Sequence, residues 1–120
     1  MLRTGALRLE LPPQGGGGQA PDAITVLLTP TGMHHYAGPP GDGTGAPERT
    51  TLHDLRQVLL DHRAAHPDGL CIERTGAGTR YRAVIAVLDE LAICGIGRYT
   101  VTEELLPWER RQLPGLAAAR

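Results

Sequence analysis

The histidines are the side chains of this chain best suited to bind a metal ion. His62 and His66 are four residues apart, a spacing that places two imidazoles on one face of a helix, as a zinc site requires. No glutamate completes an HExxH arrangement between them, so two histidines without a metal are the favoured interpretation. His34 and His35 are adjacent in a predicted strand and point to opposite faces, which argues against joint binding of one ion. We predict no native metal site.

Nucleophilic and acid–base catalysis find little support in the sequence. The chain has no serine and no lysine, which excludes a serine nucleophile, a Schiff-base lysine and a P-loop lysine. Cys71 and Cys94 are too few for a disulfide framework, and Cys94 ends a predicted helix, where the helix dipole disfavours a thiolate. Asp89 and Glu90 are interpreted as the solvated edge of that helix. We predict a protein that is not an enzyme and uses no cofactor.

A glycine-rich turn, Gly76-Ala77-Gly78, lies between a predicted strand and a predicted helix, where a helix N-terminus could bind phosphate. Tyr81 occupies the position of the third glycine of a GxGxxG motif, which favours a plain turn over a dinucleotide site. Arg74, Arg80 and Arg82 flank this turn and could meet a carboxylate or phosphate, although solvated arginines are the simpler interpretation. A small anion-binding domain that uses this turn stays open as one alternative.

Length and charge limit the possible partners. The chain has 120 residues, enough for one domain with a modest core. Its formal net charge of −1 gives no strong attraction to nucleic acid or to an anionic membrane surface. No stretch of the sequence approaches the about 20 uninterrupted apolar residues that a membrane-spanning helix needs.

The folded part is predicted to begin near Ala23, after residues 12–22, which are rich in glycine and proline and typical of a flexible tether. Ile24–Leu28 and Met33–Ala37 are predicted strands. The Pro-Thr-Gly turn between them makes an antiparallel hairpin the simplest pairing. Gly38–Arg49 is predicted to be a surface loop.

The first helix is predicted from Leu52 to about His66. It begins with a capping pattern in which Thr51 is followed three residues later by the acid Asp54. Pro67 disfavours helical geometry at the preceding residue and ends the helix. The residues that share its apolar face are Leu52, Leu55, Val58, Leu59 and His62.

The second helix is predicted to begin after Thr79, its N-terminal cap, and to end at Gly95, a left-handed C-terminal cap. Short strands precede and follow it at Leu70–Arg74 and Arg98–Thr102. A strand, a helix and a strand in succession favour a parallel pair. The apolar stripe of this helix consists of Tyr81, Val84, Ile85, Leu88, Leu91 and Ala92.

The order of elements, β-β-α-β-α-β, predicts an α+β fold in which two helices pack on one face of a four-stranded mixed sheet. The tail, residues 105–120, is broken by Pro107 and Pro114 and is expected to be peripheral. An edge strand of such a sheet can accept an added strand from a partner or from a second copy. Ile24–Leu28 and Arg98–Thr102 are the candidates, and the alternative is that both pair only within the chain.

Two segments resemble one known family. Tyr81 to Ile96 combines a tyrosine, paired aliphatic residues, a Val-Leu-Asp run and a Gly-Ile pair, and Tyr99 to Glu103 follows as a strand ending in Thr-Glu. Upstream, Leu7 to Pro12 alternates leucines with charged residues and ends in Leu-Pro. Together these features are similar to the C-terminal periplasmic domain of the ExbD/TolR biopolymer-transport family, over roughly residues 7–104.

The resemblance implies a mechanical role at the periplasmic face of the bacterial inner membrane. Such proteins form homodimers, work with an ExbB/TolQ-like membrane subunit and use the proton motive force to drive a TonB/TolA-like periplasm-spanning protein. It also implies that residues 1–22 are a linker that follows a membrane anchor upstream of Met1, and that residues 23–104 form the periplasmic domain. The candidate partner-binding residues are Arg98, Tyr99, Thr100, Val101, Thr102, Arg74, Arg80 and Arg82.

Three features depart from the family pattern. The family's proton-relaying aspartate lies in a membrane helix and has no counterpart in this sequence. The aspartate usual after the third predicted strand is replaced near Thr75, and the loop at Gly38–Arg49 is longer than is typical. A TolR-like module that binds peptidoglycan stays open as an alternative, and nucleic acid is not an expected partner.

Overall fold

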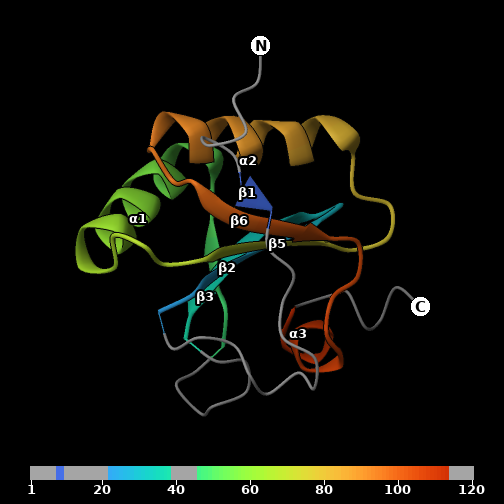
Figure 1. Ribbon diagram of the computed structural model, residues 1–120. Coiled ribbons are helices and arrows are strands. Elements are labelled where there is room, and N and C mark those ends of the chain that lie inside the picture. Colours follow the sequence, from blue (N-terminus) through green and yellow to red (C-terminus); the bar gives the residue numbers. More distant parts are fainter. Residues whose placement is uncertain (1–7, 10–21, 39–45, 114–120) are drawn as a thin grey trace.

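The computed structural model describes residues 8–9, 22–38 and 46–113. The predicted tether, apart from Asp22, lies outside the described residues. Within them, six strands form one mixed sheet and three helices cover it (Figure 1). In chain order the elements are β1 (Arg8–Leu9), β2 (Ile24–Thr29), β3 (Gly32–Ala37), β4 (Glu48–Thr50), α1 (Leu52–Ala65), β5 (Cys71–Thr75), α2 (Tyr81–Ile93), β6 (Arg98–Thr102) and α3 (Pro107–Gln112).

The strand order of the sheet is β1-β6-β5-β2-β3-β4. β2 and β3 form the predicted antiparallel hairpin, and β5 and β6 form the predicted parallel pair, so the mixed α+β fold is confirmed. The described sheet has six strands instead of four, because β1 pairs with β6 and β4 pairs with β3 at its two edges. The segment Gly38–Arg49 was predicted to be a loop, but β4 begins within its last two residues, where pairing with β3 holds the backbone extended.

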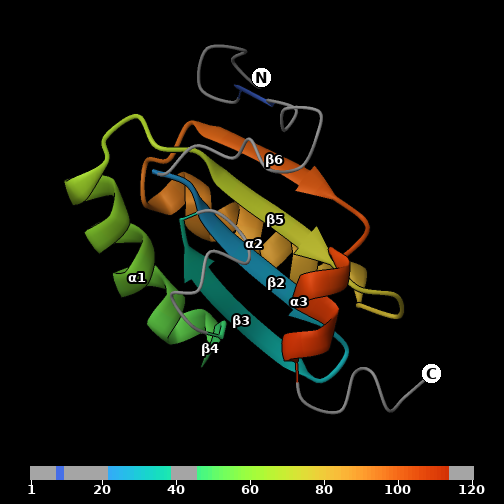
Figure 2. The same ribbon diagram turned by 90° about the horizontal axis from the view of Figure 1, so that it is seen from below.

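α1 and α2 cover one face of the sheet, as predicted, and α3 covers the opposite face, which Figure 2 shows from its own side. The larger core lies between the sheet and the first two helices. It includes alternate residues of β2 and leucines of both helices, namely Ile24, Val26, Leu28, Leu55, Leu59 and Leu91. No helix in the described part of the chain is long and apolar enough to cross a membrane.

The opposite face of β2 has a core of its own. Leu27 packs there with Tyr36 of β3 and with Leu105 and Leu113, which flank α3, and Trp108 packs against this cluster. All six residues of β2 are buried, because a central strand that is covered on both faces has no side turned to solvent. The expectation of a peripheral tail is therefore wrong for the tail residues that the structure describes, since they supply this second cover.

The two long helices begin differently. α1 has the predicted cap, in which Thr51 Oγ1 accepts a hydrogen bond of 3.1 Å from the backbone N–H of Asp54. α2 begins after Arg80, which makes no side-chain capping bond. The predicted cap, Thr79, donates its hydroxyl to the carbonyl oxygen of Leu28 at 3.1 Å. Thr79 therefore fastens the preceding turn to β2 and leaves the N-terminus of α2 without a side-chain cap.

The predicted apolar stripe of α2 is only partly buried. Leu91 is buried and Leu88 packs against the core, as expected. Tyr81 and Ile85, by contrast, have 77% and 36% of their surface exposed. The side of α2 that carries Glu90 faces α1. The opposite side of the helix, which carries Tyr81 and Ile85, is therefore left in solvent.

Candidate functional site

The predicted edge strand β6 is covered only in part. β1 pairs with it in parallel at two positions, Arg8 with Arg98 and Leu9 with Tyr99. Among the described residues, Thr100–Thr102 has a neighbouring strand on its β5 side alone. The second predicted edge strand, β2, is not an edge, because it lies between β5 and β3 and is paired on both sides.

An exposed apolar stripe of α2 borders this edge. Arg56 of α1 binds Glu90 through two bonds, Nε to Oε1 at 2.9 Å and Nη2 to Oε2 at 3.0 Å, so this side of α2 faces α1. The opposite side carries apolar residues at intervals of three or four, which are Tyr81, Ile85, Leu88 and Ala92. α1 and α2 lie side by side on one face of the sheet, so this stripe is on the side of α2 that faces away from α1 (Figure 1). We name the exposed residues of this stripe, Tyr81, Ile85 and Ala92, together with Val101 and Thr102 the β6 edge surface.

Arg74, a predicted partner-binding residue, is buried beneath α3. It has 5% of its surface exposed, and its Nε lies 3.0 Å from Oε2 of Glu109 in an ion pair. Tyr36 donates its hydroxyl to the same oxygen at 2.6 Å, and the backbone N–H of Leu106 donates to Glu109 Oε1 at 2.8 Å. Burial and the contact with Glu109 raise the pKa of Tyr36. Tyr36 and Glu109 are 73 residues apart, so no local sequence pattern could reveal this cluster.

The three arginines predicted around the Gly76–Gly78 turn do not gather there. Arg80 and Arg82 are exposed, whereas Arg74 is held by Glu109. Gly78 has a φ of 84°, a left-handed conformation in which glycine is favoured, so the backbone of the turn accounts for it. The anion-binding alternative therefore keeps only two of its three arginines.

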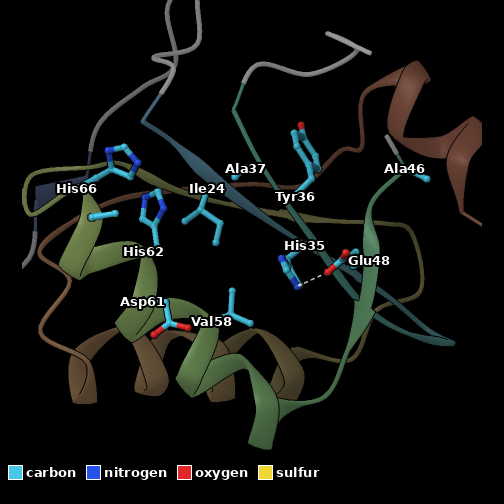
Figure 3. A pocket seen from close by; sticks show the side chains of 11 residues that line it. Ile24, His35, Tyr36, Ala37, Ala46, Glu48, Val58, Asp61, His62 and His66 are labelled. Atoms are coloured by element: carbon cyan, nitrogen blue, oxygen red, sulfur yellow. Dashed lines mark ion pairs between the residues drawn. The ribbon is translucent and has the colours of Figure 1, made fainter. Parts of the chain in front are cut away.

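Histidines line a cavity of about 610 Å³ between α1 and the β3–β4 edge (Figure 3). The ring of His62 on α1 and the ring of His66, the residue that caps the end of α1, have centres 5.0 Å apart. His35 Nε2 lies 3.7 Å from Glu48 Oε1, and His34 is buried on the opposite face of β3, as predicted. Burial lowers the pKa of His35 and His62, so both rings are neutral at pH 7. Within the described ranges, no three His, Cys, Asp or Glu side chains are grouped closely enough to hold a metal ion.

Both cysteines are free and buried. Burial raises the pKa of Cys71 and of Cys94, which disfavours a nucleophilic thiolate at either position. Cys94 Sγ donates to the carbonyl oxygen of Arg56 at 3.8 Å. Asp89 is exposed, as predicted, but Glu90 is not a solvated edge, because it is 8% exposed and bound by Arg56.

Glu73 is a fully buried carboxyl in the strand β5. It follows two residues after Cys71, which packs in the larger core, so its side chain points toward α1 and α2. Neither carboxylate oxygen has a hydrogen-bond partner among the described residues. Val26 of β2 and Val101 of β6 are its neighbours in the sheet, and burial raises its pKa to about 8. The sequence analysis did not single out Glu73. The signal that could have revealed it is that a strand with a neighbour on each side and helices on both faces has no side chain turned to solvent.

Comparison with known proteins adds no relative to this picture. No model of a known protein family matches the chain, and no protein of curated function matches it.

Proposed function

We propose that this chain is the periplasmic partner-binding and dimerisation domain of an energy transducer of the ExbD/TolR type, driven by the proton motive force and acting mechanically. The observation that carries the proposal is the β6 edge surface, where a strand with one unpaired side lies next to an exposed apolar stripe. The thiols of the described chain are buried and its histidines are not grouped as a metal site, so binding accounts for the geometry better than catalysis does.

An extended partner segment fits this surface by strand addition. Its backbone continues the sheet along Val101 and Thr102, where main-chain hydrogen bonds supply affinity. Alternate side chains of the added strand point toward α2, where Tyr81 and Ile85 offer apolar contact. A TonB/TolA-like periplasm-spanning protein and a second copy of this chain are the proposed occupants, and an ExbB/TolQ-like subunit is the proposed partner in the membrane.

The test compares two variants of closely matched exposure. Ile85→Asp places a charge in the β6 edge surface, and Leu60→Asp places the same charge on α1, where the leucine is 38% exposed against 36% for Ile85. The chain carrying each change is co-purified with the products of its neighbouring genes, and dimer content is measured by sedimentation. We expect Ile85→Asp to lower dimer content and recovery of the TonB/TolA-like protein about tenfold or more, as loss of a central interface contact does.

Leu60→Asp should leave both measurements unchanged. Equal losses in the two variants, or no loss with Ile85→Asp, would contradict the proposal. A pull-down of the full chain on isolated peptidoglycan separates an ExbD-like role, which predicts no retention, from a TolR-like role, which predicts retention. Loss of a measured phosphate affinity on Arg80→Ala, with dimer content intact, would instead favour the anion-binding alternative.

A further inference from the structure

Glu73 is a buried carboxyl group without a partner in the described part of the chain. Its side chain has no exposed surface, and both carboxylate oxygens lack a hydrogen-bond partner among the described residues. In such surroundings the protonated, neutral acid is the stable form, because a buried carboxylate without a partner loses its hydration and gains nothing in return. Burial accordingly raises the pKa of Glu73 to about 8 from its ordinary value of 4.5.

Among the described residues, no side chain pairs with Glu73, and burial is the cause of its raised pKa. On its own strand the titratable neighbour is Cys71, and β2 and β6 place valines beside it. The buried charge of α2, Glu90, is already bound by an arginine of α1. Tyr99 of β6 and Cys94 after α2 also lie in this layer, and neither carries a positive charge. An ionised Glu73 must therefore reach water.

α2 is the covering element best placed to open. Glycines join it to the sheet at both ends, with Gly76 and Gly78 before it and Gly95 and Gly97 after it. Gly78 and Gly95 have φ values of 84° and 76°, conformations that only glycine adopts easily. Its N-terminus has no side-chain cap, and Tyr81 on its outer side is exposed. β5 itself, by contrast, is held on both sides by neighbouring strands.

We propose that Glu73 acts as a proton-controlled latch on α2. While the carboxyl carries its proton, α2 lies on the sheet. When the proton passes to solvent, α2 swings outward on its flanking glycines and water reaches the carboxylate. The apolar stripe of the β6 edge surface belongs to α2, and Val101 of β6 lies beside Glu73, so that surface is complete only in the protonated state. This last consequence rests on the proposed function, whereas the latch does not.

Hydrogen exchange of the full chain tests the latch. The exchange of single amides is measured by NMR between about pH 5 and about pH 7 and corrected for intrinsic chemical exchange. Amides of Val87 and Leu91 report on α2, and those of Val26 and Leu28 report on β2. Because opening releases one proton, the opening equilibrium of α2 should rise about tenfold per pH unit, and about a hundredfold over this range. We expect the α2 amides to exchange faster than the β2 amides at each pH.

Two matched variants make the result specific. Glu73→Gln keeps the shape of the side chain and removes its titratable proton, so it should abolish the pH dependence of α2 opening. Glu104→Gln makes the same change at an exposed position and should retain it. A tenfold slope that persists in Glu73→Gln would overturn the proposal. Equal exchange of α2 and β2 amides at every pH would also overturn it, since only global unfolding would then respond to protons.

A direct titration of the unaltered chain tests the proposal even if the Glu73→Gln variant does not fold. The carboxyl carbon of Glu73 should titrate with a midpoint near the raised pKa of about 8, and a midpoint near 4.5 would overturn the latch. No partner is present in these measurements, so their failure leaves the proposed function standing. Loss of partner binding at every pH, with the slope of α2 exchange intact, would refute the proposed function alone.

Discussion

Replacing Glu109 by glutamine should release α3 from the sheet without unfolding the rest of the chain. Glu109 is fully buried, and its Oε2 lies 3.0 Å from Arg74 Nε and accepts the hydroxyl of Tyr36 at 2.6 Å. The change keeps the shape of the side chain and removes its charge. Arg74, with 5% of its surface exposed, would then be a buried cation without a counter-ion.

The expected free-energy cost of losing the ion pair is large enough to release α3 from the sheet, instead of leaving it docked in a strained fold. Breaking a buried ion pair by removing one partner costs about 3–5 kcal/mol. The remaining attachment of α3 is the packing of Trp108 against Tyr36 and the burial of Leu105 and Leu113, which contributes about 1.5–3 kcal/mol for each leucine. Fixing the backbone of the segment opposes this by about 1–2 kcal/mol per residue. Apolar burial alone therefore does not hold α3, and its release lets Arg74 regain water.

Trp108 provides the assay, because it is the only tryptophan of the chain. Its ring packs edge-on against Tyr36, with ring centres 5.0 Å apart and an interplanar angle of 79°. In Glu109→Gln, the fluorescence emission of Trp108 should shift to longer wavelength without denaturant. The amides of α3 should lose protection from hydrogen exchange, while those of α1 and β2 remain protected.

Glu104→Gln is the matched control, since it makes the same change at an exposed position close to α3. It should leave both the emission of Trp108 and the urea midpoint unchanged. The reasoning would be refuted if Glu109→Gln kept the native emission together with a native urea midpoint. It would also be refuted if α1 and α3 lost protection together, because α3 would then not be a separately docked unit.

Three further changes have expected outcomes. The free energy of unfolding should fall by up to about 5 kcal/mol as the pH rises from about 4.5 to about 8, because the pKa of Glu73 is higher in the folded than in the unfolded chain. Urea titrations across this range measure the fall, and Glu73→Gln should remove it. Leu59→Ala should lower the unfolding free energy by about 2–5 kcal/mol, seen as a lower urea midpoint at constant slope. Thr51→Ala should cost about 1 kcal/mol in the same titration and fray the first turn of α1 in hydrogen exchange.

Local signals in the sequence were sufficient for most of the elements. The cap at Thr51 and the end of α2 at Gly95 were predicted because each depends on residues within about one helical turn. β1 and β4 could not be predicted in this way. Strands of two and three residues carry no periodic pattern, and these two form because β6 and β3 offer unpaired backbone at the edges of the sheet.

Contacts between distant segments explain what the sequence did not reveal at the candidate site. The sequence around Arg74 favoured a solvated arginine. Its counter-ion, Glu109, comes from a tail that shows no periodicity of its own, so no sequence pattern indicated this ion pair. β6 could be predicted as a strand parallel to β5 from its own residues and from the helix that precedes it. The burial of Glu73 could not, since it follows only from the position of β5 between β2 and β6 and from the α2 cover.

Glu73 and Arg74 carry opposite charges on consecutive residues, yet strand alternation sends them to opposite faces of the sheet, where neither neutralises the other. Arg74 forms an ion pair with Glu109 beneath α3, while Glu73 has no hydrogen-bond partner among the described residues. The two sites share no partner, so their perturbations should act separately. Glu109→Gln should leave the pH dependence of α2 exchange in place, and Glu73→Gln should leave the emission of Trp108 unchanged. A shift of that emission in Glu73→Gln would mean instead that both covers of the sheet open as one cooperative unit.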